Sequence, residues 1–368
     1  MTQPQETRQR HPYFMYDAIM RQPEAVREVL QRHAAQTREV AANIAGKRRL
    51  YLVGIGTSWH AVLVAQHWFR RLAAGGPEVQ GWHSFEFCAY PPPLSQDDAV
   101  IVISHRGTKT YSFLALELAQ SRGAYTISIT STDPGPRIQV ADVVLNTVAQ
   151  ERSAAFTVSY TAALAVLALL AAGLGSLTGG SEDVPRLRAD LEKAPGAMTR
   201  VLSSEPGIQR AVQRFQGQQR FICAGWGPNT ANAYEVALKI KETSAADSEG
   251  IQIEQLLHGP FCSVDHRCLL TLIAPPGPGY ERAANVARAA FQVDAPVWAL
   301  VQEGDSLLSD LATEAFTLPP VSELWSPLVY VAPLQLFTYH LALARGAHPD
   351  LFQQDSPKQA AARQHYDL

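Results

Sequence analysis

The sequence has 368 residues, of which 46% are hydrophobic and 18% are charged, and its formal net charge is −3. This length suits two globular domains of about 150–200 residues each, and the composition excludes a disordered chain. A slightly acidic chain carries no broad basic field. Nucleic acids and anionic membranes are therefore not expected partners.

The cysteines and the N-terminus favour a cytoplasmic protein. None of the four cysteines belongs to a Cys-x-x-Cys pair, so we expect reduced thiols and no metal site. The opening residues, MTQPQETRQRHPYF, lack the apolar core of a signal peptide. The longest apolar run, residues 162–174, is shorter than the roughly 20 residues of a membrane span, and we expect a buried helix there.

The first half of the chain alternates apolar strands with helical segments. Strands are predicted at residues 50–53, 97–104, 124–130 and 142–147, and helices at 58–72 and 110–121. This alternation is typical of a parallel sheet that is covered on both faces. Residues 176–185 then have the small, polar composition of a linker.

After the linker the same alternation begins again. A long helical stretch is predicted at 186–202, strands at 220–224, 268–274 and 295–302, and helices at 230–244 and 325–345. Both halves contain a strand, a Gly-x-Gly turn and a helix, which indicates duplication of one fold. We predict a helical lead-in (residues 1–45) and two tandem doubly wound α/β domains of three layers each, flavodoxin-like or Rossmann-like (46–180 and 181–368).

Doubly wound sheets bind ligands at the carboxyl ends of their strands, which directs attention to residues 54–58, 104–110 and 225–230. In the 54–58 turn, Gly56, Thr57 and Ser58 offer backbone N–H groups and hydroxyls at a helix N-terminus, which suits an anion. A tight turn with Ser58 as N-cap is the alternative. Trp59 stands where a dinucleotide fingerprint needs its third glycine, so a nicotinamide-dependent oxidoreductase ranks last and no cofactor is expected.

The 104–110 loop gives the stronger signal for an anion. It joins a buried strand to a helix and contains the sequence Ser104, His105, Arg106, Gly107, Thr108 and Lys109. Cations without counter-charges are unfavourable at a helix N-terminus, whereas a phosphate there would receive charge-assisted hydrogen bonds. We therefore predict phosphate binding. A solvated turn with both cations in water is the alternative.

A helix in the second half supplies candidate acid and base groups. Glu242 lies on the predicted 230–244 helix, and His258 follows sixteen residues later in His-Gly-Pro. Isomerising a sugar requires a group that opens the ring, a carboxylate that moves a proton between adjacent carbons, and a grip on the phosphate. A surface ion pair and an ordinary loop histidine are the alternatives for these two residues.

Five segments together resemble the isomerase domain of the glucosamine-6-phosphate synthases. They are residues 13–23 (YFMYDAIMRQP), 56–61 (GTSWHA), 237–244 (ALKIKETS), 257–260 (LHGP) and 333–346 (PLQLFTYHLALARG). They follow the family's order along nearly the whole chain. The resemblance implies two SIS (sugar isomerase) domains.

The resemblance also implies roles for individual residues. Glu242 would be the proton-transferring base, with Lys239 in the same site, and His258 would open the ring from across a homodimer interface. Ser58 and the 104–110 loop would hold the sugar phosphate, and Glu151 would line the site. Lys358, the one lysine of the tail, lies near the position of the family's imine-forming lysine.

At several positions the sequence differs from the family's pattern, which limits the roles that the resemblance implies. The amidotransferase half is not in this sequence, so we expect no glutaminase activity. Arg106 and Lys109 stand where the family has small hydroxyl residues, and Lys358 has different neighbours. The function expected is an isomerase, deaminase or deglycase for an amino-sugar or amine-linked sugar 6-phosphate. A non-catalytic sugar-phosphate-binding regulator is the alternative.

Overall fold

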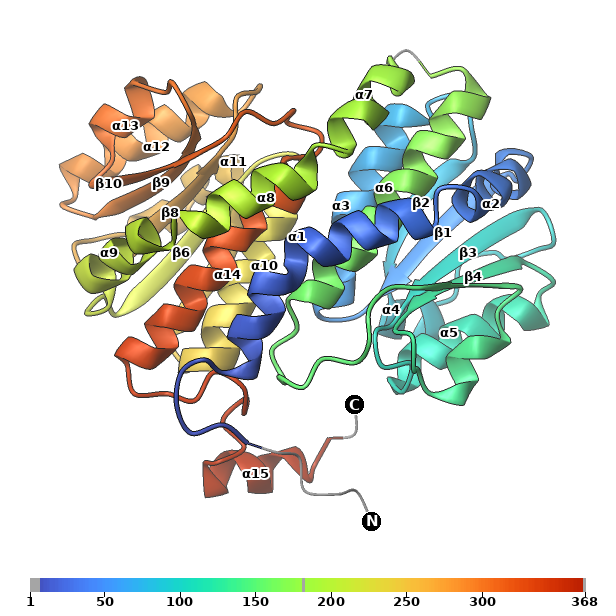
Figure 1. Ribbon diagram of the computed structural model, residues 1–368, viewed down its shortest axis with the longest axis horizontal. Coiled ribbons are helices and arrows are strands. Elements are labelled where there is room, and N and C mark those ends of the chain that lie inside the picture. Colours follow the sequence, from blue (N-terminus) through green and yellow to red (C-terminus); the bar gives the residue numbers. More distant parts are fainter. Residues whose placement is uncertain (1–6, 181–182, 367–368) are drawn as a thin grey trace. The chain divides into compact units, whose positions relative to one another are not determined.

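The computed structural model describes residues 7–180 and 183–366 (Figure 1). The chain forms two compact units, each with its own sheet. The first unit comprises Gln22–Glu151 and Val158–Lys193, and the second comprises Arg152–Thr157, Ala194–Gln364 and the segment that ends at Arg21. Each unit is described by itself below.

The first unit contains a five-stranded parallel sheet in the order β2-β1-β3-β4-β5. Its strands are β1 (Arg49–Gly54), β2 (Glu78–His83), β3 (Asp98–Ile103), β4 (Tyr125–Thr130) and β5 (Val143–Asn146). Its helices are α2 (Gln36–Ala45), α3 (Thr57–Leu72), α4 (Ser84–Ala89), α5 (Thr110–Ser121), α6 (Val158–Thr178) and α7 (Val184–Leu191). The helix α1 (Phe14–Arg32) precedes them.

Helices cover both faces of this sheet. The helices α4 and α5 pack on one face, and α3 and α6 pack on the other (Figure 1). Strands β1 and β3 are buried along their whole length, because each lies between two helical layers. Two covered faces explain why these strands read as unbroken apolar runs rather than as alternating ones.

The second unit repeats this architecture with the strand order β10-β9-β8-β6-β7, and all of its strand pairs are parallel. Its strands are β6 (Arg220–Gly225), β7 (Asp247–Gln252), β8 (Cys268–Ala274), β9 (Val297–Gln302) and β10 (Glu314–Leu318). Its helices are α8 (Ala194–Ser203), α9 (Glu205–Phe215), α10 (Asn229–Ser244), α11 (Ile253–Leu257), α12 (Tyr280–Gln292), α13 (Leu307–Leu311), α14 (Ser326–Ala344) and α15 (Pro357–Arg363). The predicted duplication of form is therefore present in the sheet topology.

Two helices among the described residues, α6 and α14, are long and apolar enough to cross a membrane. However, 78% and 83% of their apolar stretches are buried inside the structure. Core helices of globular domains have this character, and the predicted buried helix at 162–174 lies inside α6.

The α/β fold with parallel sheets is confirmed, but a predicted helix and the predicted linker differ from the structure. The single helical stretch expected at 186–202 is two helices, because α7 ends at Leu191 and α8 begins at Ala194. Pro195 explains the break, since proline lacks an N–H and its ring clashes with the carbonyl four residues earlier. The predicted linker is shorter than expected, because α6 continues to Thr178 and α7 begins at Val184. Residues 181 and 182 lie outside the described part.

The three strands that the sequence did not reveal are the edge strands β2, β7 and β10. Their sequences EVQGWH, DSEGIQ and EAFTL contain polar residues, and two of them contain glycine. An edge strand is exposed along one side, so it needs fewer apolar residues than a central strand.

Candidate functional site

The topology of the first sheet brings two predicted binding segments together. The chain runs from β1 outward to β2 and then returns to β3 on the other side of β1, so the direction of winding reverses between β1 and β3. The 54–58 turn follows β1 and the 104–110 loop follows β3. These two segments therefore flank the crevice in which doubly wound sheets bind their ligands.

The 54–58 turn depends on its two glycines. A Cβ atom at Gly54 would lie 2.5 Å from the carbonyl oxygen of Ser58, so no side chain fits between the strand end and α3. Gly56 has φ +59°, a left-handed conformation that glycine adopts without strain. The helix α3 begins directly afterwards at Thr57, so the turn presents a helix N-terminus to the crevice.

The 104–110 loop is fixed by contacts from neighbouring segments. The carbonyl of Ser104 accepts a hydrogen bond of 2.7 Å from the hydroxyl of Thr130, and the carbonyl of Arg106 accepts one of 2.9 Å from the N–H of Gly135. Gly107 has φ +65°, and a Cβ there would lie 2.4 Å from the side chain of Ile138. The loop therefore has a defined shape before any ligand binds.

The two cations of this loop lie close enough to influence each other. The pKa of Lys109 is lowered from its usual value, first by burial and second by the positive charge of Arg106. Thr108 is exposed. Like charges held together favour an anion that would interact with both of them. Phosphate binding by this loop stays a prediction.

The N-terminus of α5 adds hydrogen-bond donors next to these cations. Its N-cap residue, Lys109, has no side-chain capping bond, and no described residue accepts from the N–H groups of Thr110 and Tyr111. The hydroxyl of Ser104 is buried and has no hydrogen-bond partner among the described residues. A buried hydroxyl without a partner costs about 1–3 kcal/mol, so a bound anion would stabilise this segment.

His105 of this loop contacts Glu151. The backbone N–H of Glu151 donates a hydrogen bond of 3.2 Å to Nε2 of His105, and burial lowers the pKa of this imidazole. The Glu151 carboxylate accepts a hydrogen bond of 2.9 Å from the N–H of Ser159 in the first turn of α6. A carboxylate is favourable at a helix N-terminus, so Glu151 anchors α6 as well as the loop.

The predicted base, Glu242, lies on α10 of the second unit in a buried charge cluster. The ammonium of Lys239 lies 2.5 Å from Glu242 and 3.4 Å from Glu235. The side chains of Glu235, Lys239 and Glu242 are 0%, 1% and 10% exposed. Glu242 is therefore the member of the cluster with access to solvent. Glu235 was not predicted as a site residue, although its spacing of four from Lys239 was the available signal.

The other two predicted catalytic residues have different surroundings. The imidazole of His258 is 66% exposed, and its Nδ1 lies 2.9 Å from the carbonyl oxygen of Glu254. Lys358 is exposed on α15. An exposed histidine is available to a second molecule, which is compatible with the role that the resemblance implies for His258. The roles of both residues stay predictions.

Comparison with known proteins gives the first unit a family. Residues 43–173 match the family model described as the SIS domain. This segment is similar to the SIS domain. It contains β1 to β5, the 54–58 turn, the 104–110 loop and Glu151, so the crevice described above lies at the carboxyl edge of the sheet in this segment, which is called the SIS sheet below.

Relatives extend the similarity beyond the SIS domain. A glutamine–fructose-6-phosphate aminotransferase (isomerizing) from Thermococcus kodakarensis is 31% identical over 343 residues, which are 92% of this chain and 56% of the relative. The chain thus spans little more than half the length of the curated relatives that it matches. The predicted resemblance to the isomerase part of these enzymes is confirmed.

Solved structures agree on the fold. The C-terminal domain of the glucosamine–fructose-6-phosphate aminotransferase of Francisella tularensis has a TM-score of 0.84 at 19% identity, over 92% of this chain and 98% of that one. A glucosamine-6-phosphate deaminase from Thermotoga maritima has a TM-score of 0.73 at 19% identity, over 92% of this chain and 97% of that one.

The second sheet differs from the SIS sheet at the equivalent crevice, which lies between β6 and β8. Trp226 follows β6 there, and its indole N–H donates a hydrogen bond of 3.0 Å to Glu323. A Cβ at Gly279 would lie 2.3 Å from the indole, so the ring is packed directly against the loop after β8. Trp226 is the middle residue of the Gly-x-Gly turn after β6, where the turn after β1 has Ile55.

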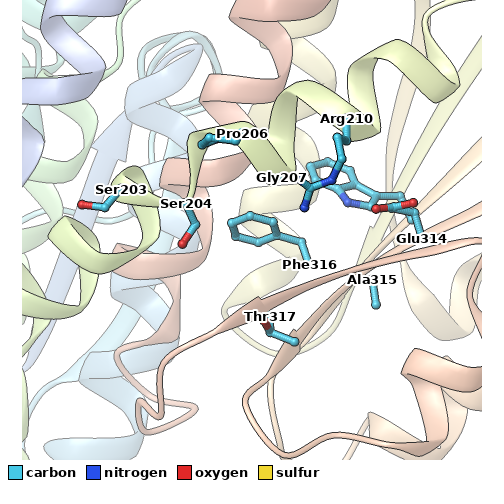
Figure 2. A pocket seen from close by; sticks show the side chains of 10 residues that line it. Ser203, Ser204, Pro206, Gly207, Arg210, Glu314, Ala315, Phe316 and Thr317 are labelled. Carbon is cyan, nitrogen blue, oxygen red and sulfur yellow. The ribbon is translucent and has the colours of Figure 1, made fainter.

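A pocket of about 370 Å³ lies elsewhere in the second unit (Figure 2). The α8–α9 turn and the edge strand β10 enclose it, and Arg210 reaches toward Phe316 across it. None of the predicted site residues of the SIS domain or of α10 lines it. The sequence contained no signal for this pocket.

Proposed function

We propose that the chain binds a sugar 6-phosphate and transfers protons between the first two carbons of that sugar. The observation that carries the proposal is the 104–110 loop, where two neighbouring cations, an uncapped helix N-terminus and the buried hydroxyl of Ser104 lie together. Phosphate esters carry the charge and the acceptor oxygens that this set of donors lacks. Ser58 and Thr57 of the neighbouring turn add hydroxyls.

The proton chemistry is assigned to Glu242 and His258. An enediol or enolamine forms when a carboxylate removes a proton from the carbon next to a carbonyl or imine. Glu242 is suited to this step because the ammonium of Lys239, 2.5 Å away, stabilises the ionised carboxylate. His258 is suited to ring opening because an imidazole has one ring nitrogen that donates a proton and another that accepts one.

Three reactions share this proton transfer: aldose–ketose isomerisation, deamination of an amino sugar, and deglycation of an amine-linked sugar phosphate. Names of the relatives include an isomerizing aminotransferase and a glucosamine-6-phosphate deaminase, which supports this range. The exposed position of Lys358 on α15 favours a reaction without a lysine imine from that residue. Deglycation meets this condition, because it needs a base and an acid.

The proposal includes a homodimer in the cytoplasm. The family resemblance assigns His258 to the partner's site, and 66% exposure of this side chain is compatible with that arrangement. No metal or cofactor is part of the proposed chemistry.

The test is turnover of fructose 6-phosphate, glucosamine 6-phosphate and a fructosamine 6-phosphate by the purified protein. We expect turnover of at least one compound and a loss of kcat of about 10²–10⁴ in Glu242→Gln, because this change removes the base. Glu249→Gln on β7 is the matched control, since this carboxylate is exposed. Absence of turnover for all three compounds, or equal activity of both variants, would contradict the enzymatic proposal.

A non-catalytic sugar-phosphate sensor is the second candidate. Arg106 and Lys109 favour it, because bulky cations can hold an anion tightly without leaving room for rapid exchange. Calorimetric binding of these compounds without turnover would select this candidate.

A further inference from the structure

The first turn of α5 contains a second buried hydroxyl that the proposed function does not use. Ser112 is the third residue of α5 and is 1% exposed. Its Oγ has no hydrogen-bond partner among the described residues. Serine in a helix commonly bonds to a carbonyl of the preceding turn, as Ser121 does with Leu118 at the end of this same helix. Ser112 lacks even this local bond.

The side chain of Ser112 lies at the N-terminal end of α5, where the anion is proposed to bind. Ser112 shares a buried helix face with Ala115, Leu116 and Ala119, which pack on the sheet beside Val102. Ser104 comes two residues after Val102 and so continues on the same side of β3. Side chains in a first helical turn also lean toward the N-terminus of their helix. The hydroxyls of Ser104 and Ser112 therefore both lie between β3 and α5, at the end where β3 stops and α5 begins.

The groups at this end of α5 are mainly hydrogen-bond donors. They are the N–H groups of Thr110 and Tyr111, the ammonium of Lys109 and the hydroxyl of Ser104 at the end of β3. These groups can donate hydrogen bonds, and most of them cannot accept one. A phosphate oxygen would supply the missing acceptor. The layer therefore contains a set of donors that an anion would complete.

We propose that Ser112 is a further phosphate-binding residue, which donates its hydroxyl proton to the anion held by the 104–110 loop. This inference rests on the phosphate site of the proposed function and deepens it. The family resemblance implies small hydroxyl residues at the positions of Arg106 and Lys109, and Ser112 supplies a hydroxyl from the helix instead. The phosphate lies at the N-terminus of α5 in contact with both Ser104 and Ser112.

The test measures binding of inorganic phosphate and of fructose 6-phosphate by calorimetry, together with the thermal stability of the free protein. In Ser112→Ala we expect binding of both ligands to weaken about tenfold, because one hydrogen bond to a charged group is lost. The free protein should be as stable as the wild type or more stable, since an unpaired buried hydroxyl is removed. Ser112→Thr keeps the hydroxyl and should restore binding.

Ser128 provides the matched control. It is buried on β4 and also has no hydrogen-bond partner among the described residues, but it lies two residues before the end of the strand. Ser128→Ala should bind both ligands as the wild type does. Equal affinity of Ser112→Ala and wild type, equal losses in the two alanine variants, or no binding by the wild type would each overturn the inference. Binding that depends on Ser112 without turnover would leave the inference intact and refute only the proposed catalysis.

Discussion

Lys109 and Arg106 show how much two residues of one loop reveal about a ligand. Their sequence positions predicted an anion, because they follow a buried strand at the start of a helix. The structure adds that Lys109 is partly buried and is affected by the charge of Arg106. The roles of Ser104 and Ser112 could not be predicted from the sequence in the same way. A serine in a sequence is compatible with many environments, and only packing shows that its hydroxyl is buried without a partner.

The lowered pKa of Lys109 predicts that phosphate binding weakens in alkaline solution. An anion favours the protonated lysine, so affinity should fall as the pH rises through the lysine pKa, by up to about tenfold per pH unit. Phosphate stays a dianion between about pH 8 and pH 10, so a change there reports on the protein. Calorimetry across this range measures the effect.

Two substitutions separate this explanation from general alkaline unfolding. Lys109→Met should bind more weakly at neutral pH and lose the alkaline dependence. Arg106→Ala should move the alkaline fall to higher pH, because it removes one cause of the lowered pKa. An unchanged alkaline fall in both variants would contradict the role of Lys109.

At the scale of elements, the sequence predicted the helix α10 but not the burial of its charged residues. Its helical pattern and its acidic and basic residues are evident from the sequence. However, the burial of Lys239 between two carboxylates results from packing against α14, β6 and β7. The helix ends at Ser244, and its C-cap residue, Ala245, has φ +53° in the left-handed region. The sequence does not predict this helix cap, because the usual residue at this position is glycine.

The cap of α10 gives a prediction about stability. Ala245→Gly should raise the free energy of unfolding by about 0.5–1 kcal/mol, because glycine relieves the strain of a left-handed alanine. Urea denaturation followed by circular dichroism measures the change. Ala246→Gly is the control, since Ala246 is 5% exposed and has no positive φ. We expect this control to lower stability, and a loss of stability in both variants would refute the argument.

At the scale of the whole molecule, one sheet topology occurs twice with different side chains after its strands. Both sheets have the same strand order, yet the SIS sheet has donors at its crevice and the second sheet has Trp226 and Glu323. The two sheets therefore share a backbone arrangement and differ in the side chains that follow their strands. Function follows the side chains of a site more than its fold.

The proposed sharing of His258 between subunits predicts complementation. Glu242→Gln and His258→Asn should each be nearly inactive, whereas purified mixed dimers of the two variants should regain about one half of wild-type activity, because one of their two sites has both groups. Light scattering would measure the dimer, and kinetics would measure the recovery. A purified mixed dimer without activity would show that His258 acts within its own chain.

The sequence by itself determined the alternation of strands and helices, the two Gly-x-Gly turns, the cations of the 104–110 loop and the family resemblance. These features are local, because they depend on spacing, apolar runs and residue type within short segments. Only the tertiary structure decided that Trp226 packs against Gly279, that Lys239 is buried, and that the hydroxyls of Ser104 and Ser112 have no hydrogen-bond partner in the described part of the chain. Burial and hydrogen bonding depend on segments far apart in the chain, and no local pattern records which of them meet.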